Sequence, residues 1–369
     1  MSGRDEAIPG DARDAVPDDT HGGAYAVVVP TLGRPSLRAC LRALALAGDP
    51  RPVRVVLVDD RPDPGGPPLT AAVPASLSDI TTVVRGAAAG PAAARNTGWR
   101  AAGPVEWIVF LDDDVVPGPA WARDLALDLA AATRRTAAVT ARIVVPLPAH
   151  RPPTDWERST AGLATARWIT ADMAYRRAAL EAVGGFDERF RRAFREDADL
   201  ALRVLGAGWT VSAGDRTTTH PVRPAGRWVS LRSQVGNADD VLMTRIHGRD
   251  WWLRARAPRG RLPRHLAVTT AAAAALTGAA LGRHRFAAAC AAAWLAGTAE
   301  FALARIVPGP WTRDETAAMT LTSVLIPPAA SWHWLRGQLA HRGTAPFRPA
   351  GAGESALPPR RPAEERVRP

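Results

Sequence analysis

Three consecutive aspartates, Asp112 to Asp114, follow an apolar run in the stretch VFLDDDVVPG, residues 109–118. A turn or a helix N-cap, the plain alternative, requires one acidic side chain at most. Three mutually repelling carboxylates therefore predict a positively charged partner. Carboxylate oxygens are the ligands that magnesium and manganese prefer, and such an ion keeps open positions for substrate phosphates. A second acidic pair, Asp59-Asp60, follows the apolar run VRVVLV. We therefore expect a divalent metal ion, magnesium or manganese, near these acids.

A third acidic group, Glu196, Asp197 and Asp199, lies in FREDADLALRVLGAGW, residues 194–209. The apolar residues of this stretch recur at helical spacing, which places the three acids in the first turn of a helix. Acids there favourably oppose the helix dipole, and that alone is a sufficient structural explanation. The functional alternative is a general base that takes a proton from an attacking hydroxyl. His220, in TTTHPVRP, follows a predicted strand and is the best-placed histidine for a metal, although a lone histidine is more often structural or exposed.

The elements that position these acids alternate between short β-branched runs and longer alanine- and leucine-rich segments, from residue 25 to about 214. This pattern predicts an α/β fold with an open, mainly parallel sheet covered on both faces. Ligands of such sheets bind beyond the carboxyl ends of the strands, where two of the acidic groups lie. The chain lacks GxGxxG after its first strand and lacks GxxxxGK(S/T), which argues against a dinucleotide fold and a P-loop NTPase. The expected strands are 26–30, 53–60, 80–84 and 106–112, and the expected helices are 36–48, 91–102 and 118–132.

Composition limits the domain organisation and the partners. The chain has 369 residues, enough for one large domain with extra elements or for two domains. Its net charge is +11 and all 47 basic residues are arginine, which predicts attraction to phosphates, anionic lipid or nucleic acid. Cys40 and Cys290 are the only cysteines, so neither a disulfide framework nor a cysteine zinc site is expected. The segments 1–23 and 343–369 are polar, rich in Pro and Gly, and predicted to be disordered tails.

A basic and apolar region, residues 249–342, is predicted to follow a domain at 24–248. Six arginines and two tryptophans occupy 249–264, directly before apolar runs at 266–282 and 286–307. This combination favours a membrane surface over nucleic acid, so no nucleic-acid partner is expected. The first run has 17 residues, where a crossing helix needs about 20, and Glu300 interrupts the second. A short hairpin, an interfacial helical pair and a soluble helical appendage all remain open.

Taken in order, these segments resemble the family 2 glycosyltransferases of the GT-A fold over about residues 25–250. The resemblance is carried by VVVPTLGRPSLRACLRAL, VRVVLVDD, GPAAARNTGWRAA, VFLDDDVVP, TADMAYRRAALEAVGGFDERF and FREDADLALRVLGAGW. The first two segments are weak alone, whereas the ordered set is specific. It implies a GT-A type nucleotide-diphospho-sugar transferase fold with a helical C-terminal region. It also implies a bacterial enzyme at the cytoplasmic face of the cell membrane, where nucleotide sugars are available.

The resemblance further implies roles for individual residues. Asp197 would be the catalytic base, with Glu196 and Asp199 as helpers. Asp114, Asp112 and His220 would hold the metal. Asp172 could equally be a structural acid, and the segment around Arg95 could simply start a helix that packs on the sheet. The residues that would border the donor or the acceptor are Pro30, Thr31, Arg34, Asp59, Asp60, Arg95, Asn96, Asp112, Asp113 and Asp172.

The implied activity is a metal-dependent, inverting transfer of a sugar from a nucleotide-diphosphate donor to a hydroxyl of a cell-envelope or lipid-linked saccharide acceptor. Arg61 stands where the family often has glycine after the acidic pair, which leaves the nucleotide open. The chain has no Q-x-x-R-W motif, which argues against a processive synthase. Two alternatives remain. A sugar-phosphate nucleotidyltransferase usually begins with a glycine- and arginine-rich loop that is absent here. A non-catalytic, membrane-tethered binding protein is disfavoured by the intact acids at 112–114 and 196–199.

Overall fold

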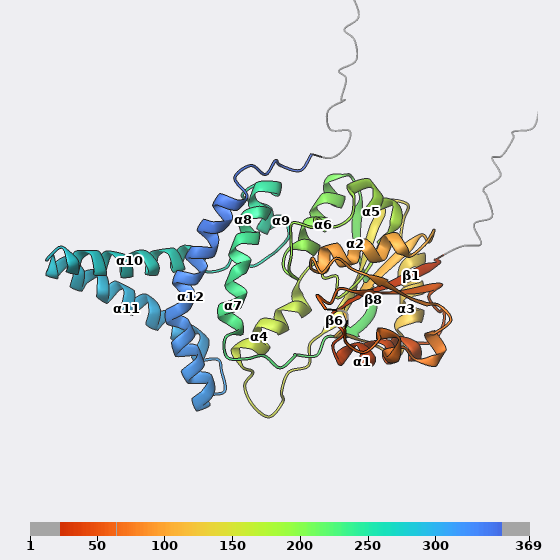
Figure 1. The fold of residues 1–369 in the computed structure, drawn as a ribbon, viewed down its shortest axis with the longest axis horizontal. Helices are drawn as coiled ribbons and strands as arrows, with labels where there is room; N and C mark the ends of the chain where they lie inside the picture. Colours follow the sequence, from red (N-terminus) through yellow and green to blue (C-terminus); the bar gives the residue numbers. More distant parts are fainter. Residues whose placement is uncertain (1–22, 64, 349–369) are drawn as a thin grey trace, which may run out of the picture.

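The structure, a computed structural model, describes residues 23–63 and 65–348. Its strands form one sheet in the order β3-β2-β1-β4-β7-β6-β8-β5, and helices cover both faces (Figure 1). The strands are β1 Tyr25–Thr31, β2 Arg54–Asp59, β3 Thr81–Arg85, β4 Trp107–Leu111, β5 Val116–Pro117, β6 Thr136–Val144, β7 Asp172–Arg176 and β8 Thr210–Thr219.

The helices of the sheet domain alternate with these strands as the sequence pattern predicts. They are α1 Ser36–Leu46, α2 Pro91–Ala101, α3 Trp121–Ala130, α4 Asp155–Ala161, α5 Arg177–Val183 and α6 Glu196–Gly206. The later helices are α7 Val229–Arg232, α8 Gly236–His247, α9 Trp251–Arg254, α10 Leu262–Ala280, α11 His284–Ile306 and α12 Arg313–Ala340. Short 3₁₀ turns at Leu69–Ala72, Ala75–Leu77, Gly162–Thr165 and Ser233–Val235 complete the described elements.

The predicted α/β class is confirmed, and the sheet is mixed rather than parallel throughout. β3, β2, β1 and β4 run parallel, whereas β7 lies antiparallel between β4 and β6. The predicted helix 118–132 begins later, at Trp121, because Val116 and Pro117 pair with the end of β8. A strand of two residues gives too short a pattern to be recognised from its sequence.

Two apolar clusters hold the helices against the two faces of the sheet. α1 and α3 bury one side of their surface against one face, together with the inward residues of β1 and β2. α2, α5 and α6 cover the other face. Gly98 of α2 shows how close this packing is, because a Cβ there would lie 2.2 Å from Cγ1 of Val28. Burial on both faces explains why the central strands are apolar at every position.

The C-terminal helices form a helical hairpin, α10 and α11, and one long helix, α12, beside the sheet domain. α10 and α11 pack side by side and project from the body, while α12 crosses their base (Figure 1). α12 packs closely on α8, where a Cβ at Gly337 would lie 2.8 Å from Cα of Ala238. Within the described residues, α11 is the one helix long and apolar enough to cross a membrane.

The first residues of the predicted C-terminal tail, 343–348, are described in the structure. The backbone N–H of Phe347 donates to the carbonyl of Ile246 at 3.0 Å, and its ring packs against the core. One aromatic anchor therefore orders the start of a segment that is otherwise polar. The remainder of that predicted tail, 349–369, and the predicted N-terminal tail up to residue 22 lie outside the described residues.

Candidate active site

A metal-binding group forms where β4 and β8 end. Val116 of β5 pairs with Thr219 of β8, so the residues just before Val116 lie beside those just after Thr219. Asp112, Asp114 and His220 are thereby brought together, with one ligand atom from each within 4.8 Å of the others. The donor set, two carboxylates and an imidazole, suits a divalent ion such as manganese.

The environment of His220 leaves one ring nitrogen free to act as a ligand. Nδ1 lies 3.2 Å from the carbonyl oxygen of Pro221, a contact in which the ring donates its proton. Nε2, which then carries the lone pair, faces Oδ1 of Asp114 at 3.9 Å. Burial raises the pKa of Asp114, and repulsion from Asp112 raises it further. A bound cation would relieve both effects, so the residues present fit a metal.

Arg223, which the sequence analysis overlooked, takes part in the same group. Its Nε forms an ion pair with Oδ2 of Asp114 at 2.8 Å, and its side chain remains half exposed. The available signal was its position in HPVRP, three residues after His220. A guanidinium beside a metal carboxylate can also bind a phosphate of a ligand.

The middle aspartate of the triplet has a different task from its neighbours. Asp113 is 2% exposed, and its two oxygens accept hydrogen bonds from Thr31 Oγ1 at 2.6 Å and from Arg34 Nη1 at 3.0 Å. These contacts join the end of β1, beside Pro30, to the end of β4. Thr31, Arg34 and Asp113 therefore form one hydrogen-bonded group, in which Asp113 positions the other two side chains.

The two acids after β2 differ in how much capacity they keep for a ligand. Asp59 is held by Arg61 through a two-fold contact of 2.8 and 2.7 Å and by Arg85 at 3.3 Å, and its hydrogen bond to Arg61 lowers its pKa. Asp60 accepts from the Gly90 N–H at 3.2 Å, while its Oδ1 is buried without a partner among the described residues. An unpaired buried oxygen is costly unless a ligand satisfies it. Of the pair, Asp60 is the acid with an oxygen that no described residue satisfies.

Arg95 joins the metal acids to the acidic helix start. It is 2% exposed, and it donates to Asp112 Oδ1 at 2.7 Å and to Glu196 Oε1 at 2.9 Å. Arg95 therefore crosses from the end of β4 to the first residue of α6. Its ion pairs are with protein carboxylates, so any effect of Arg95 on a ligand would pass through these two acids.

Asp197 is the partly exposed acid at the start of α6. Its Oδ1 accepts from the N–H of Ala198 at 2.8 Å, and burial raises its pKa, although Arg95 opposes the shift. Burial and repulsion from Asp197 also raise the pKa of Glu196. Arg195, directly before the helix, has φ +78°, a conformation rare for a residue with a β-carbon. Such backbone strain is concentrated at functional sites.

Three of the predicted site residues are instead saturated by structural contacts. Asn96 makes four hydrogen bonds, two to the backbone of Phe186 and two to the side chains of Trp99 and Glu188, and so fixes the loop around Gly185. Asp199 is fully buried and paired with Arg203 and His247. These contacts correct the expectation of a substrate contact for Asn96 and of a catalytic helper role for Asp199.

Asp172 is the third of these residues. It is 0% exposed and accepts from Arg216 Nε at 2.9 Å, from Trp121 Nε1 at 2.6 Å and from the hydroxyl of Thr218. These donors occupy three of about four acceptor positions, and the full burial of the carboxylate prevents contact with an acceptor sugar. The structure favours the structural alternative for Asp172.

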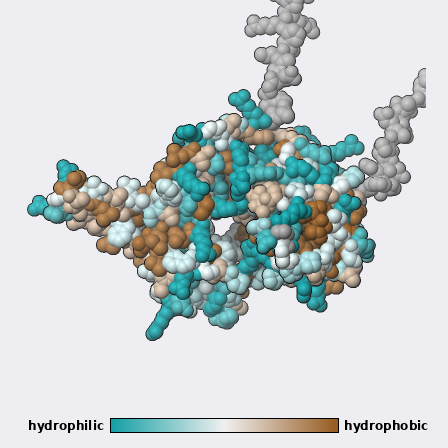
Figure 2. All heavy atoms as spheres, viewed as in Figure 1, coloured by the Kyte–Doolittle hydropathy of each residue, from teal (hydrophilic) through white to brown (hydrophobic). Residues whose placement is uncertain are grey.

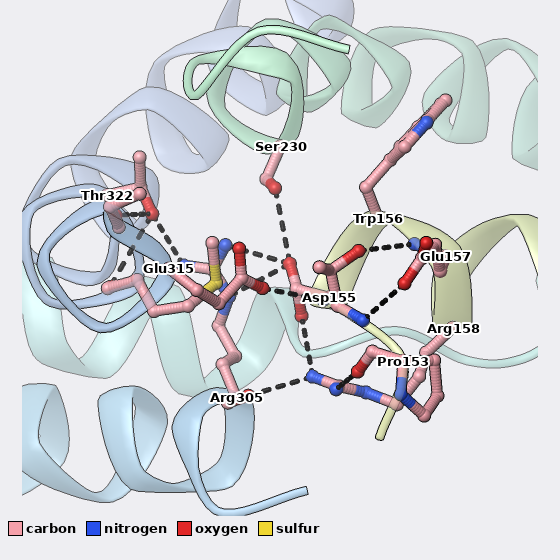
Figure 3. A network of polar contacts seen from close by, with 12 residues as sticks. Pro153, Asp155, Trp156, Glu157, Arg158, Ser230, Arg305, Glu315 and Thr322 are labelled. Atoms are coloured by element: carbon pink, nitrogen blue, oxygen red, sulfur yellow. Dashed lines mark hydrogen bonds and ion pairs between the residues drawn. The ribbon is translucent and has the colours of Figure 1, made fainter. Parts of the chain in front are cut away.

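A cavity of about 320 Å³ opens beside Arg223. Its walls come from the start of α4, from the loop 222–230 and from the first turns of α12, which contribute Glu315, Ala318 and Met319. A polar network behind it holds these elements together (Figure 3). Asp155 of α4 accepts from Arg305 at 2.9 Å and from Ser230 at 3.2 Å, and its N–H donates to Glu315 at 2.8 Å. The C-terminal helices are therefore part of the site's surroundings.

The mixed sheet, the acidic group beyond β4 and the acidic helix start of α6 define a GT-A glycosyltransferase arrangement. Residues 26–186 match the family described as Glycosyl transferase family 2. This match confirms, over residues 26–186, the resemblance that the motifs carry.

Individual relatives agree with this assignment. The pre-mycofactocin glycosyltransferases of Mycobacterium tuberculosis strains CDC 1551 / Oshkosh and ATCC 25618 / H37Rv are each 32% identical over 171 residues. The match covers 43% of this chain and spans about a third, 35%, of the length of these curated relatives. Among solved structures, the mannosyltransferase PcManGT from Pyrobaculum calidifontis, in complex with GDP-Man and Mn²⁺, has a TM-score of 0.52 at 20% identity. That likeness covers 87% of this chain and 90% of the other, and it shows the fold.

Proposed function

We propose that the chain is a metal-dependent, inverting glycosyltransferase that moves one sugar from a nucleotide-diphosphate donor to an acceptor hydroxyl. The observation that carries this proposal is the position of Arg95. It contacts Asp112 of the metal group and Glu196 of the acidic helix start at the same time. The proposed metal site and the start of the helix that carries the proposed base, Asp197, are thus joined by one arginine side chain.

The donor would bind along the carboxyl ends of β1, β2 and β4. Asp60, with its unpaired oxygen, would accept a hydrogen bond from the nucleotide base. The hydrogen-bonded group of Thr31, Arg34 and Asp113 would border the nucleotide. Asp112, Asp114 and His220 would hold the divalent ion, magnesium or manganese. When bound, such an ion supplies charge neutralisation for a departing diphosphate. Arg223 would leave Asp114 and bind a phosphate oxygen.

Asp197 would act as the general base. Its raised pKa and its partial exposure suit a group that receives a proton from an acceptor hydroxyl. Attack by that hydroxyl on the face of the sugar opposite the diphosphate inverts the anomeric carbon in one displacement. The acceptor proton passes to Asp197 and the bonding pair departs with the diphosphate. Glu196, buried against Arg95, would orient the start of the helix without touching the substrate.

The cavity beside Arg223 would receive the acceptor. Its apolar wall, which includes Val222 and Met319, and its arginines suit an acceptor that combines an apolar part with polar or anionic groups. A cell-envelope or lipid-linked saccharide meets this description. The missing Q-x-x-R-W motif supports a non-processive transfer. The catalytic domain would lie at the cytoplasmic face of the membrane, where nucleotide sugars are present.

The test is a screen of nucleotide sugars for manganese-dependent hydrolysis and transfer, followed by Asp197→Ala. We expect this variant to lose roughly 10²- to 10⁴-fold in turnover while retaining its affinity for the nucleotide. Asp79→Ala, at a 65% exposed side chain paired with the exposed Arg51, is the matched control and should behave as wild type. Near-normal transfer by Asp197→Ala would refute the assignment of the base. Absence of binding by every nucleotide sugar would refute the proposed function.

A further inference from the structure

The long helix α12 exposes an apolar stripe on the side that faces away from the protein. One face of the helix, including Met319, Thr322, Ile326 and Ala330, is buried. At 3.6 residues per turn, the exposed apolar side chains fall within about 100° of one another on the opposite side. From Leu321 to Leu339 the stripe is about 27 Å long, at roughly 1.5 Å per residue. Its members are Leu321, Val324, Leu325, Trp332, Leu335 and Leu339, which are 37–71% exposed.

The adjoining hairpin of α10 and α11 extends this apolar surface. Leu276, Leu281, Phe286 and Leu295 are 53–75% exposed. Figure 2 shows apolar side chains gathered over α11 and α12, at the base of the projecting hairpin. A helix that is apolar on its buried and on its exposed side is not explained by packing within a soluble protein. Exposed apolar surfaces of this extent mark a partner.

Charged residues at both ends of the hairpin limit how it can meet a bilayer. Arg283 and Arg285 lie at its tip, and near its base Glu300 is paired with Arg261 and with Arg264. From Arg285 to Glu300 the helix rises about 22 Å at 1.5 Å per residue. The hydrocarbon core of a bilayer is about 30 Å thick, so an upright hairpin would place one charged end inside it. A hairpin lying flat keeps both ends at the level of the headgroups.

The flanking charges also indicate which partner covers the surface. Arg336 borders the stripe and Arg342 follows the end of α12. Arg283 and Arg285 lie exposed at the tip of the hairpin. Such cationic residues repel a second copy of the same chain, whereas they attract the anionic headgroups of a membrane.

We propose that the stripe of α12 and the flat hairpin of α10 and α11 form one bilayer-binding surface, with α12 lying in the boundary between headgroups and acyl chains. Because α12 also contributes Glu315, Ala318 and Met319 to the cavity, this orientation places the cavity at the membrane surface. The proposal stands independently of sugar transfer, since it rests on the exposed surface alone.

Flotation of the full chain with vesicles of 30% phosphatidylglycerol and 70% phosphatidylethanolamine tests the surface. Leu321→Glu with Leu325→Glu should weaken binding at least tenfold. The matched control, Leu46→Glu with Leu127→Glu, changes leucines that are 71% and 64% exposed on α1 and α3 and should bind within twofold of wild type. Thermal unfolding shows whether both pairs remain folded. The proposal would be overturned if the wild-type chain did not float or if both pairs of substitutions weakened binding equally. It would also be overturned if light scattering showed a dimer that Leu321→Glu with Leu325→Glu converts to a monomer.

Two depth measurements test the orientation. Lipids brominated along the acyl chain should quench Trp332, and Trp332→Phe should lose that part of the quenching. For the hairpin, His284→Cys in a Cys290→Ser background puts a thiol at the tip, while Cys40 is fully buried. An impermeant maleimide added outside the vesicles should label position 284. Labelling that requires detergent would mean that the tip has crossed the bilayer and would contradict the flat orientation.

Discussion

Arg95 offers the sharpest test of how the site is held together. Replacing it by methionine keeps the unbranched apolar part of the side chain and removes the guanidinium charge between Asp112 and Glu196. The side chain of Asp112 is 27% exposed and can gain water, whereas that of Glu196 is 3% exposed and cannot. Removing one partner of a buried ion pair costs about 3–5 kcal/mol. Protonation of Glu196 limits this penalty, so we expect a loss near the lower end, about 3 kcal/mol, at neutral pH.

The loss should depend on pH with a definite sign. Burial already raises the pKa of Glu196, and loss of Arg95 raises it further. In the variant the folded state therefore binds more protons than the unfolded state above about pH 4.3, and stability falls as the pH rises towards the folded pKa. Adding Glu196→Gln to Arg95→Met should recover about 1–3 kcal/mol, because a neutral amide replaces the unpaired charge.

Urea unfolding of the full chain at pH 5.5 and pH 8, followed by tryptophan fluorescence, measures both effects. Arg123→Met, at a 71% exposed side chain paired only with its neighbour Asp124, is the control and should change stability by less than about 0.5 kcal/mol. A loss below about 1 kcal/mol for Arg95→Met, or one that is equal at the two pH values, would refute the bridging role.

Three further changes address the acids and the metal. The rate of transfer should fall on acidification, because only deprotonated Asp197 accepts a proton. The raised pKa of Asp197 should place this fall at a higher pH than for an exposed aspartate. In a pH–rate profile, Asp197→Asn should abolish this dependence. Asp172→Asn should lower stability by about 1–3 kcal/mol in urea unfolding without changing the KM for the acceptor, since Arg216 loses a buried partner. His220→Ala should weaken Mn²⁺ binding at least tenfold by calorimetry, because loss of even an outer partner of a metal ligand costs roughly 10–100-fold.

The fold was predictable from sequence where one strand and one helix alternate within a short segment. The apolar runs before Asp59 and Asp112 are buried on both faces of the sheet, so their continuous apolar character identifies them as strands. The antiparallel insertion of β7 was not predictable, because the partners of β7 lie more than thirty residues away along the chain. The pairing of β5 with β8, which brings His220 to Asp114, rests on two residues and leaves no periodic signal.

The sequence predicts which residue types lie at the candidate site, but it does not predict which of their side chains remain free to contact a ligand. Asp113, Asp172 and Asp199 are acids at the expected places, yet each is satisfied by donors that no local pattern identifies. Arg216 lies 44 residues from Asp172 and reaches it only because β8 and β7 share the sheet. Spacing predicts where a carboxylate lies along the chain, whereas its availability to a ligand depends on the charges that the fold brings to it.

The segment 220–230, which runs from the end of β8 to the start of α7, contacts each part of the candidate site. His220 at its start belongs to the metal group, and Arg223 pairs with Asp114 and lines the cavity. Ser230 at its end binds Asp155, which is held in turn by Arg305 of the C-terminal hairpin. A ligand that draws Arg223 away from Asp114 must therefore alter the wall of the cavity. Because the same segment reaches the metal group, the cavity and the residues that hold the hairpin, the proposed donor site, acceptor site and membrane-binding helices are directly connected through it.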